Sequence, residues 1–393
     1  MKDVALIRFG EIFLKGENRP FFERMLLQNA QRAVSRLPGA RVEKIHGRLL
    51  AFPNEAGMAP MMSALTRLFG ASSLSPARVM ERDLATITAA AVELTRAEVE
   101  RLGRKPRFKI EARRADKRFV ANSMEINRVV GGAVVQALDL PVDVHTPELT
   151  IGVEVGWDQA FVYAGIIPAP GGLPAGVTGR VELLLSGGID SPVAGWMMLK
   201  RGCVLNATYF HSFPYTGEKT QDKVTRLAKQ LANWQLSDIR LKIVPFTDAQ
   251  KALRAANPDG KMSVVLYRRM MMRIAERIAR ASDAKALATG EALAQVASQT
   301  LENLGVIGAA SSLPILRPCL GHDKQETIAI ARRIGTFETS IEPYDDCCSL
   351  FVPEHPQTKS RLDIAEKIEA SLDIKAIADD CYRRATELTI TPY

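Results

Sequence analysis

The residues best suited to chemistry form the run Leu184-Leu185-Ser186-Gly187-Gly188-Ile189-Asp190-Ser191-Pro192. An apolar segment precedes this run and a helical pattern follows it, so it is predicted to join a strand to a helix. Two glycines permit a tight turn and a close approach to a ligand, Ser191 can cap the helix, and Pro192 can occupy its first position. Free N–H groups and the positive dipole end of such a helix favour an anion. The loop is therefore predicted to hold phosphates, using Ser186, Gly187, Gly188 and Ser191.

The phosphate loop does not follow the Walker A pattern, because Gly-x-x-x-x-Gly-Lys-Ser/Thr is absent. Ser-Gly-Gly-x-Asp-Ser over Ser186–Ser191 instead resembles the pyrophosphate loop of the ATP pyrophosphatases. This resemblance implies attack on the α-phosphate of ATP with release of pyrophosphate, and it implies a catalytic role for Asp190 in handling Mg²⁺ and the nucleotide. A Gly-Gly turn alone is structural in most proteins. The six-residue match between a strand and a helix favours the functional interpretation.

The elements around this loop alternate regularly. Strand patterns lie at residues 181–185, 204–210, 241–246 and 285–289, and helical patterns at 192–201, 218–233, 262–281 and 324–334. Such alternation predicts βαβ units and a doubly wound parallel sheet. Ligands bind at the carboxyl edge of such sheets, which is where the phosphate loop is expected to lie.

The first 167 residues show a different organisation. Short strand patterns are mixed there with helical patterns at residues 23–34, 55–68, 84–102 and 123–138, which predicts small α+β units. Three prolines and three glycines then fall within the nine residues 168–176. Neither a helix nor a ladder continues through such a stretch, so it is predicted to be a linker between domains.

A basic run lies in the second of these small units. Between residues 104 and 118 there are eight cationic residues and only two acidic ones, Glu111 and Asp116. The cationic residues are Arg104, Lys105, Arg107, Lys109, Arg113, Arg114, Lys117 and Arg118. A solvated surface is the usual explanation of a charge run. The alternative is a surface that contacts nucleic-acid phosphates, and the net charge of +8 for the 393-residue chain is compatible with it.

The composition, with 47% apolar and 24% charged residues, is ordinary for a soluble globular protein. The first residues lack the order of a signal peptide, and the sequence has no apolar run of about 18 residues, so neither export nor a membrane is expected. The five cysteines form neither a CxxC pair nor a zinc-finger spacing, which predicts buried or redox-active thiols rather than a disulfide framework.

Several further segments narrow the family. Residues 8–19, RFGEIFLKGENR, look like the opening of the tRNA 4-thiouridine synthetases (tRNA sulfurtransferases). Later segments are similar to that family in the same order, at residues 171–176, 290–300, 317–318 with 323–324, and 345–348. The resemblance implies a ferredoxin-like domain at 1–58, an RNA-binding THUMP domain at 59–167, a linker at 168–178, and an α/β pyrophosphate-loop domain at 179–393. The THUMP assignment favours a tRNA-facing role for the basic run.

The resemblance also implies a nucleotide site. Carried over residue by residue, ATP would contact Leu184, Leu185, Tyr209, Phe210, Arg268, Gly290 and Gln299, in addition to the phosphate loop. These positions lie at successive strand ends, which would line one crevice. One of the two aromatic residues is expected to belong to the core. Arg268 is preferred over the adjacent Arg269, which points in a different direction on a helix.

The reaction implied is ATP-dependent transfer of AMP to O4 of a uridine, expected at position 8 of tRNA. Sulfur from a persulfide then replaces that oxygen and gives 4-thiouridine. The resemblance implies a cysteine desulfurase as donor and a possible homodimer. Relatives that act in thiamine synthesis carry a rhodanese domain, which this sequence lacks, so that role is in doubt. Cys348 is the first candidate for the sulfur acceptor and Cys347 the second, because the pair precedes a proline-rich loop. Two buried or incidental thiols are the alternative.

Two other functions compete with this interpretation. Another pyrophosphate-loop enzyme, such as a 2-thiouridine synthase or an amide-forming ATP pyrophosphatase, would share the loop. The N-terminal third argues against this alternative, because small-molecule synthetases need no basic RNA module. A tRNA-binding module with a vestigial nucleotide site would share the N-terminal third, but the intact Ser186–Ser191 loop argues against decay.

Overall fold

The computed structural model describes residues 1–215, 217–343 and 356–393. These residues form two compact units, residues 1–174 and residues 175–393. The division falls inside the predicted linker. Cys347 and Cys348 lie outside the described residues.

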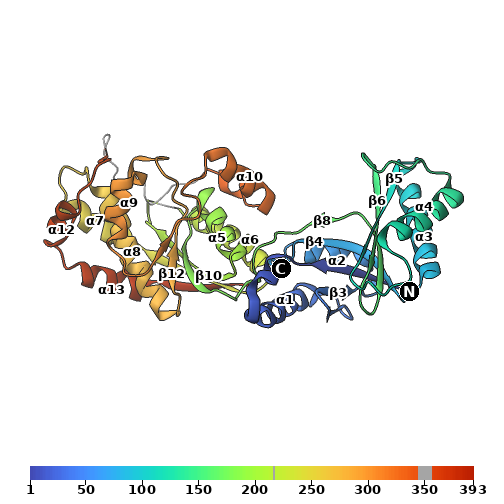
Figure 1. Ribbon diagram of the computed structural model, residues 1–393. Coiled ribbons are helices and arrows are strands. Elements are labelled where there is room, and N and C mark those ends of the chain that lie inside the picture. The colour runs from blue at the N-terminus through green and yellow to red at the C-terminus, as the bar shows by residue number, and fades with distance from the viewer. Residues whose placement is uncertain (216, 344–355) are drawn as a thin grey trace. The chain divides into compact units, whose positions relative to one another are not determined.

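The first unit is built on one mixed sheet with the strand order β2-β3-β1-β4-β7-β6-β5, and β8 also pairs with β4 (Figure 1). Only β5 and β6 run parallel; the other neighbours are antiparallel. The elements are β1 (Lys2–Arg8), η1 (Glu11–Asn18), α1 (Arg19–Val34), β2 (Arg41–Ile45), β3 (Arg48–Phe52), α2 (Met58–Leu65), β4 (Ser73–Met80), α3 (Leu84–Leu102), β5 (Phe108–Arg114), α4 (Ser123–Leu138), β6 (Leu149–Val155), β7 (Ala160–Ala164) and β8 (Ile167–Pro168).

Helix ends in the first unit follow local sequence signals. The Asp83 side chain caps α3, and Gly103 ends that helix in the left-handed conformation, with φ at 66°. Asn122 and Glu125 form a capping box at the start of α4.

Sequence patterns did not predict strand β4. Pro76 lies within it, where β4 pairs with neither β7 nor β8, so its missing N–H breaks no ladder bond on that side.

The second unit is a doubly wound sheet with the strand order β13-β12-β9-β10-β11-β14 (Figure 1). The elements are β9 (Gly179–Leu184), α5 (Asp190–Lys200), β10 (Cys203–His211), α6 (Glu218–Gln235), β11 (Ile239–Pro245), α7 (Thr247–Ala255), α8 (Ser263–Ala281), β12 (Ala286–Ala288), η2 (Ala297–Gln299), α9 (Leu301–Gly308), β13 (Ile315–Leu316), α10 (Lys324–Ile334), α11 (Phe337–Ile341), α12 (Leu362–Glu369), α13 (Ile374–Arg384) and β14 (Thr386–Ile390).

The sheet of the second unit is parallel except at one edge. Strands β9 to β13 pair in parallel, as the alternation of patterns predicts, while β14 closes the edge antiparallel to β11. Helices α5 and α6 pack together and against β10, and α8 and α13 pack together, with α8 against β9 and α13 against β11. Helix α8 buries Leu266, Met270 and Ile274 in the main apolar cluster. The carboxyl ends of β9, β10 and β12 therefore meet on a fixed framework.

Candidate active site

The phosphate loop joins β9 to α5, as predicted, but its helix begins earlier than expected. Helix α5 starts at Asp190, so Ser191 and Pro192 are its second and third residues rather than its cap and first residue. Ser191 does not cap the helix; its Oγ accepts a hydrogen bond from the N–H of Ser186 at 2.9 Å and lies 3.1 Å from the Ser186 Oγ. A serine that bridges the two ends of the loop fixes the loop's shape and leaves the helix start open.

The loop offers donors to a ligand. The N–H groups of Gly187 and Ile189 donate to no other residue in the described parts of the chain. They precede the N-terminus of an 11-residue helix, where the dipole also favours an anion. The loop therefore fits the phosphates of a nucleotide.

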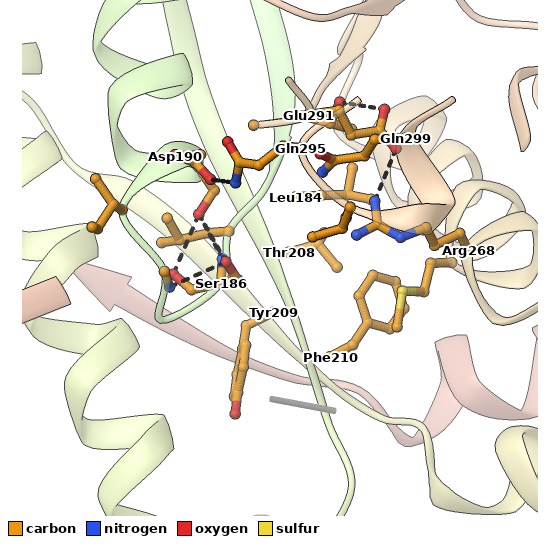
Figure 2. A pocket seen from close by; sticks show the side chains of 18 of the residues that line it. Leu184, Ser186, Asp190, Thr208, Tyr209, Phe210, Arg268, Glu291, Gln295 and Gln299 are labelled. Carbon is orange, nitrogen blue, oxygen red and sulfur yellow. Dashed lines mark hydrogen bonds and ion pairs between the residues drawn. The ribbon is translucent and has the colours of Figure 1, made fainter. Parts of the chain in front are cut away.

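Asp190 is held by two side chains from distant parts of the sequence. Its Oδ1 accepts from Nζ of Lys324 at 2.8 Å. Its Oδ2 accepts from Nε2 of Gln295 at 2.9 Å (Figure 2). Sequence patterns gave no role to either residue. Lys324 is the first residue of α10, whose N-cap is Asp323. A lysine in the first turn opposes the helix dipole, and that unfavourable placement is a signal that could have marked it as functional.

These residues open onto a cavity of about 470 Å³ at the carboxyl edge of the sheet. Its size lies in the usual range for small-molecule sites. Of the residues predicted to contact ATP, all but Gly187 line it, namely Leu184, Leu185, Ser186, Gly188, Ser191, Tyr209, Phe210, Arg268, Gly290 and Gln299, together with Asp190.

The cavity has chemically different ends. Ser186 and Asp190 lie on one side, Phe210 and Arg268 on the other, and Leu184 and Thr208 between them (Figure 2). Tyr209 and Phe210 both line the cavity, and both are buried, each 5% exposed. This separation suits a ligand with phosphates at one end and an apolar ring at the other.

Gly290 brings β12 against the start of α5. A Cβ at this position would lie 2.5 Å from the backbone N of Ser191 and 2.6 Å from the carbonyl carbon of Asp190. Only glycine allows this approach, because neither backbone contact can give way without moving the phosphate loop. Gln299 follows nearby, and its buried Oε1 has no hydrogen-bond partner among the described residues. Such an orphaned acceptor in a cavity wall is suited to a ligand donor.

The two adjacent arginines of α8 separate as expected. Arg268 lines the cavity and donates from Nη1 to Oε1 of Glu291 at 2.9 Å. Arg269 is buried on another side of the helix, where Nε and Nη2 bind both carboxylate oxygens of Glu369 at 2.8 Å. Of this pair, Arg268 is therefore the one that lines the cavity.

The three cysteines within the described residues are buried and carry no disulfide. Burial raises the pKa of Cys319 to about 12, and the nearby charge of Asp190 adds to the rise. Burial likewise raises the pKa of Cys381 to about 11, with Asp380 adding to it, and it raises the pKa of Cys203. The thiolate is the nucleophile, so all three are poorly suited to carrying sulfur.

The basic run lies on and around β5, and many of its members form local ion pairs. Examples are Lys105 with Asp139 at 2.8 Å and Arg118 with Asp116 at 3.0 Å. Arg113 is also paired, with Glu111 at 2.7 Å, but Arg113 and Arg114 in addition line a second cavity of about 470 Å³ within the first unit. Its wall also includes Arg19, Arg48, His46 and Trp157. Cations beside an indole ring suit a nucleic-acid backbone with an accessible base.

The three parts of the chain match three known domains. Residues 4–75 match the ThiI ferredoxin-like domain, residues 81–164 the THUMP domain, and residues 176–374 the family described as thiamine biosynthesis protein (ThiI). A pyrophosphate-loop domain behind an RNA-binding module thus defines the class. The chain belongs to the ThiI family of tRNA sulfurtransferases, which confirms the family, fold class and enzyme type predicted from the sequence.

Relatives match along nearly the whole chain. The probable tRNA sulfurtransferase of Caldanaerobacter subterraneus subsp. tengcongensis is 44% identical, over 99% of this chain and 100% of that protein. The one from Brevibacillus brevis is 44% identical, over 99% and 97%. A solved 4-thiouridine synthetase–RNA complex with bound ATP is 36% identical, with a TM-score of 0.90 over 99% of this chain and 100% of that one. PH1313 from Pyrococcus horikoshii, 24% identical with a TM-score of 0.68 over 85% and 99%, shares the fold.

No helix in the described parts of the chain combines the length and the apolar character that a membrane span needs.

Proposed function

We propose that the protein converts a uridine of tRNA, at position 8, into 4-thiouridine at the expense of ATP. The observation that carries this proposal is the phosphate loop. Its Gly187 and Ile189 N–H groups donate to no acceptor among the described residues, and the Lys324–Asp190 ion pair lies next to them. ATP would bind with its phosphates at Ser186, Gly187, Gly188 and Ser191. The adenine ring would occupy the apolar end, against Leu184 and Phe210, with Leu185, Tyr209, Arg268, Gly290 and Gln299 completing the site.

The chemistry required is activation of a poor leaving group. Transfer of AMP from ATP to O4 of the uridine releases pyrophosphate and weakens the C4–O4 bond. The outer sulfur of a persulfide then bonds to C4, and AMP departs with the oxygen. A second thiol attacks the inner persulfide sulfur, so the S–S bond breaks, its electron pair stays on the sulfur bound to C4, and the two thiols are left as a disulfide. The loop amides and Lys324 would stabilise charge that develops on the α-phosphate, since donors fixed before the reaction lower its barrier. Gln295 would keep the Asp190 carboxylate oriented.

Mg²⁺ fits this arrangement through Asp190. Proteins often bind Mg²⁺ through one or two carboxylates together with substrate phosphates, and each Asp190 oxygen keeps a lone pair beside its single donor. No group of three or more His, Cys, Asp or Glu side chains in the described ranges could hold a metal by itself. Bound there, Mg²⁺ would supply charge neutralisation at the phosphates.

The source and the path of the sulfur belong to the same proposal. A cysteine desulfurase would supply the persulfide, and Cys348 or Cys347 would accept it. The buried, high-pKa thiols of Cys203, Cys319 and Cys381 support this choice by elimination. We further propose that the enzyme works in the cytoplasm and forms a homodimer.

Reconstitution tests the proposed function. Purified protein with ATP, Mg²⁺, a persulfide donor and unmodified tRNA should yield AMP, pyrophosphate and one 4-thiouridine per tRNA. Mass analysis of the nucleosides and measurement of AMP follow the two products separately. AMP formation that tRNA does not stimulate, or sulfur at another uridine atom, would contradict the proposal.

We propose that tRNA binds the first unit mainly through the cavity that Arg113 and Arg114 line, with the rest of the basic run adding long-range attraction. Arg113 is the better probe, because Nη1 of Arg114 donates to the carbonyl of Lys117 and so supports the loop. Arg113→Ala is expected to weaken tRNA binding about tenfold at moderate salt, and to lower the slope of log affinity against log salt by about one.

Lys105→Ala is the matched control for the Arg113 prediction. Both residues are exposed and paired with one carboxylate, Arg113 with Glu111 at 2.7 Å and Lys105 with Asp139 at 2.8 Å. Only Arg113 lines the cavity. Binding measured by filter retention at several salt concentrations should change less than twofold for Lys105→Ala. Equal losses in the two variants would assign the effect to net charge alone.

A further inference from the structure

The Arg268 side chain in the nucleotide cavity belongs to a buried triad. Glu291 is 2% exposed and accepts from Nη1 of Arg268 at 2.9 Å through Oε1. Its Oε2 accepts from Nε of Arg317 at 2.7 Å and from Oγ1 of Thr289 at 2.9 Å. Burial alone would raise the pKa of Glu291, but the charges of Arg268 and Arg317 outweigh it and hold that pKa below its usual value. Glu291 is therefore ionised at neutral pH.

The members of this triad have unequal access to the cavity. Arg268 and Glu291 line it, and Arg317 does not. Arg317 follows β13, and its Nη2 lies 3.4 Å from the carbonyl oxygen of Leu304 on α9. Among the described residues that line the cavity, Glu291 is the one to which Arg317 donates a hydrogen bond. Its part in the site must therefore pass through that carboxylate.

The charges of the triad set its effect on an anion. One carboxylate between two guanidinium groups leaves a net charge of +1 on the three side chains. Without Arg317, Glu291 would balance Arg268 alone, and the pair would present no net charge to the anionic nucleotide. Charge effects are large where protein excludes water, so a cation behind the carboxylate can govern an anion in front of it.

We propose that Arg317 is a positioning residue for nucleotide binding. Its guanidinium neutralises the Glu291 carboxylate, so that the positive charge of Arg268 is not cancelled and can attract the nucleotide. This inference rests on the proposed function, in that the cavity must bind ATP. In this inference Arg317 acts through Glu291, so replacing Glu291 as well as Arg317 should restore nucleotide binding.

The chain contains a natural control. Arg269, Glu369 and Arg273 form a second arginine–carboxylate–arginine triad on the same helix α8, with Nη1 and Nη2 of Arg273 at 2.8 and 2.7 Å from the two Glu369 oxygens. None of its members lines the cavity. Arg273→Met removes one cation from a buried triad, as Arg317→Met does, without involving the nucleotide.

The test measures binding of α,β-methylene-ATP with Mg²⁺ by calorimetry, beside the melting temperature of each variant. Arg317→Met should weaken binding about tenfold, while Arg317→Lys and Arg273→Met should stay within about twofold of wild type. The double variant Arg317→Met/Glu291→Gln should recover to within about threefold of wild type, because the neutral amide still accepts from Arg268 and no longer cancels its charge.

The outcomes separate the two proposals. If the double variant binds as weakly as Arg317→Met or more weakly, or if Arg273→Met weakens binding equally, Arg317 has a merely structural role and the inference is wrong. If Arg317→Met does not fold, normal binding by the double variant supports the inference, and weak binding by a folded Arg317→Lys contradicts it. If wild type binds no nucleotide, the proposed function fails. Normal binding without thiolation would leave the inference standing and contradict the function.

Discussion

Asp190→Asn is expected to lower both AMP formation and 4-thiouridine yield about a thousandfold while leaving the fold intact. Asparagine has the same shape and can keep the contact with Gln295, so the side chain stays in place. It lacks the negative charge that pairs with Lys324 at 2.8 Å and that would hold Mg²⁺ beside the phosphates. The loss should therefore fall on turnover more than on nucleotide affinity.

Asp248→Asn is the matched control for this substitution. Asp248 occupies the first turn of α7 as Asp190 occupies that of α5, but it is exposed, pairs with Arg384 and lies away from the cavity. Its turnover should match wild type within about twofold. Single-turnover AMP release and nucleoside mass analysis measure both variants. A residual turnover above a tenth of wild type in Asp190→Asn would remove Asp190 from the proposed mechanism.

Gly290→Ala is expected to weaken nucleotide binding and to lower the rate of AMP formation about a hundredfold, because a displacement of catalytic geometry by about 1 Å costs that much in rate. The added Cβ would lie 2.5 to 2.7 Å from the backbone of Asp190 and Ser191, so either β12 or the phosphate loop must move. The loop is held by hydrogen bonds between Ser186 and Ser191, whereas β12 is paired with a strand on each side, β9 and β13, so the loop should be the part that shifts.

Gly305→Ala provides the comparison. Gly305 lies in α9, is exposed, and a Cβ there would meet no atom within 4 Å. Alanine should stabilise this helix by about 0.5 to 1 kcal/mol and leave binding unchanged. Titration with α,β-methylene-ATP and thermal unfolding distinguish the two variants. Wild-type affinity in Gly290→Ala would mean that the close approach of β12 to the loop is dispensable.

Local patterns were sufficient for the framework of the site. The strand, the glycine pair and the helical pattern around residues 184–201 predict a phosphate loop, because strand, turn and helix preferences act over a few residues. Alternation of strands and helices predicts that successive strand ends share an edge, which agrees with the positions of Tyr209, Phe210 and Gly290 that the family resemblance implied. Family resemblance supplied the identity of the ligand and the choice of Arg268.

Contacts between distant residues could not be predicted in this way. Lys324 and Gln295 reach Asp190 from 134 and 105 residues further along the chain, and periodicity carries no record of such partners. The start of α5 was also predicted two residues late, because Ser191 and Pro192 satisfy the local rules for a helix start. The loop instead uses the Ser191 hydroxyl to bind Ser186.

By itself, the sequence determined the phosphate loop, the order of the domains and the membership of the family, since these are written in short segments of adjacent residues. Only the tertiary structure decided how the charges are shared: Asp190 between Lys324 and Gln295, and Glu291 between Arg268 and Arg317. The reason is physical. Side-chain charges interact through space at a few ångströms, and packing of the sheet and its helices decides which of them meet.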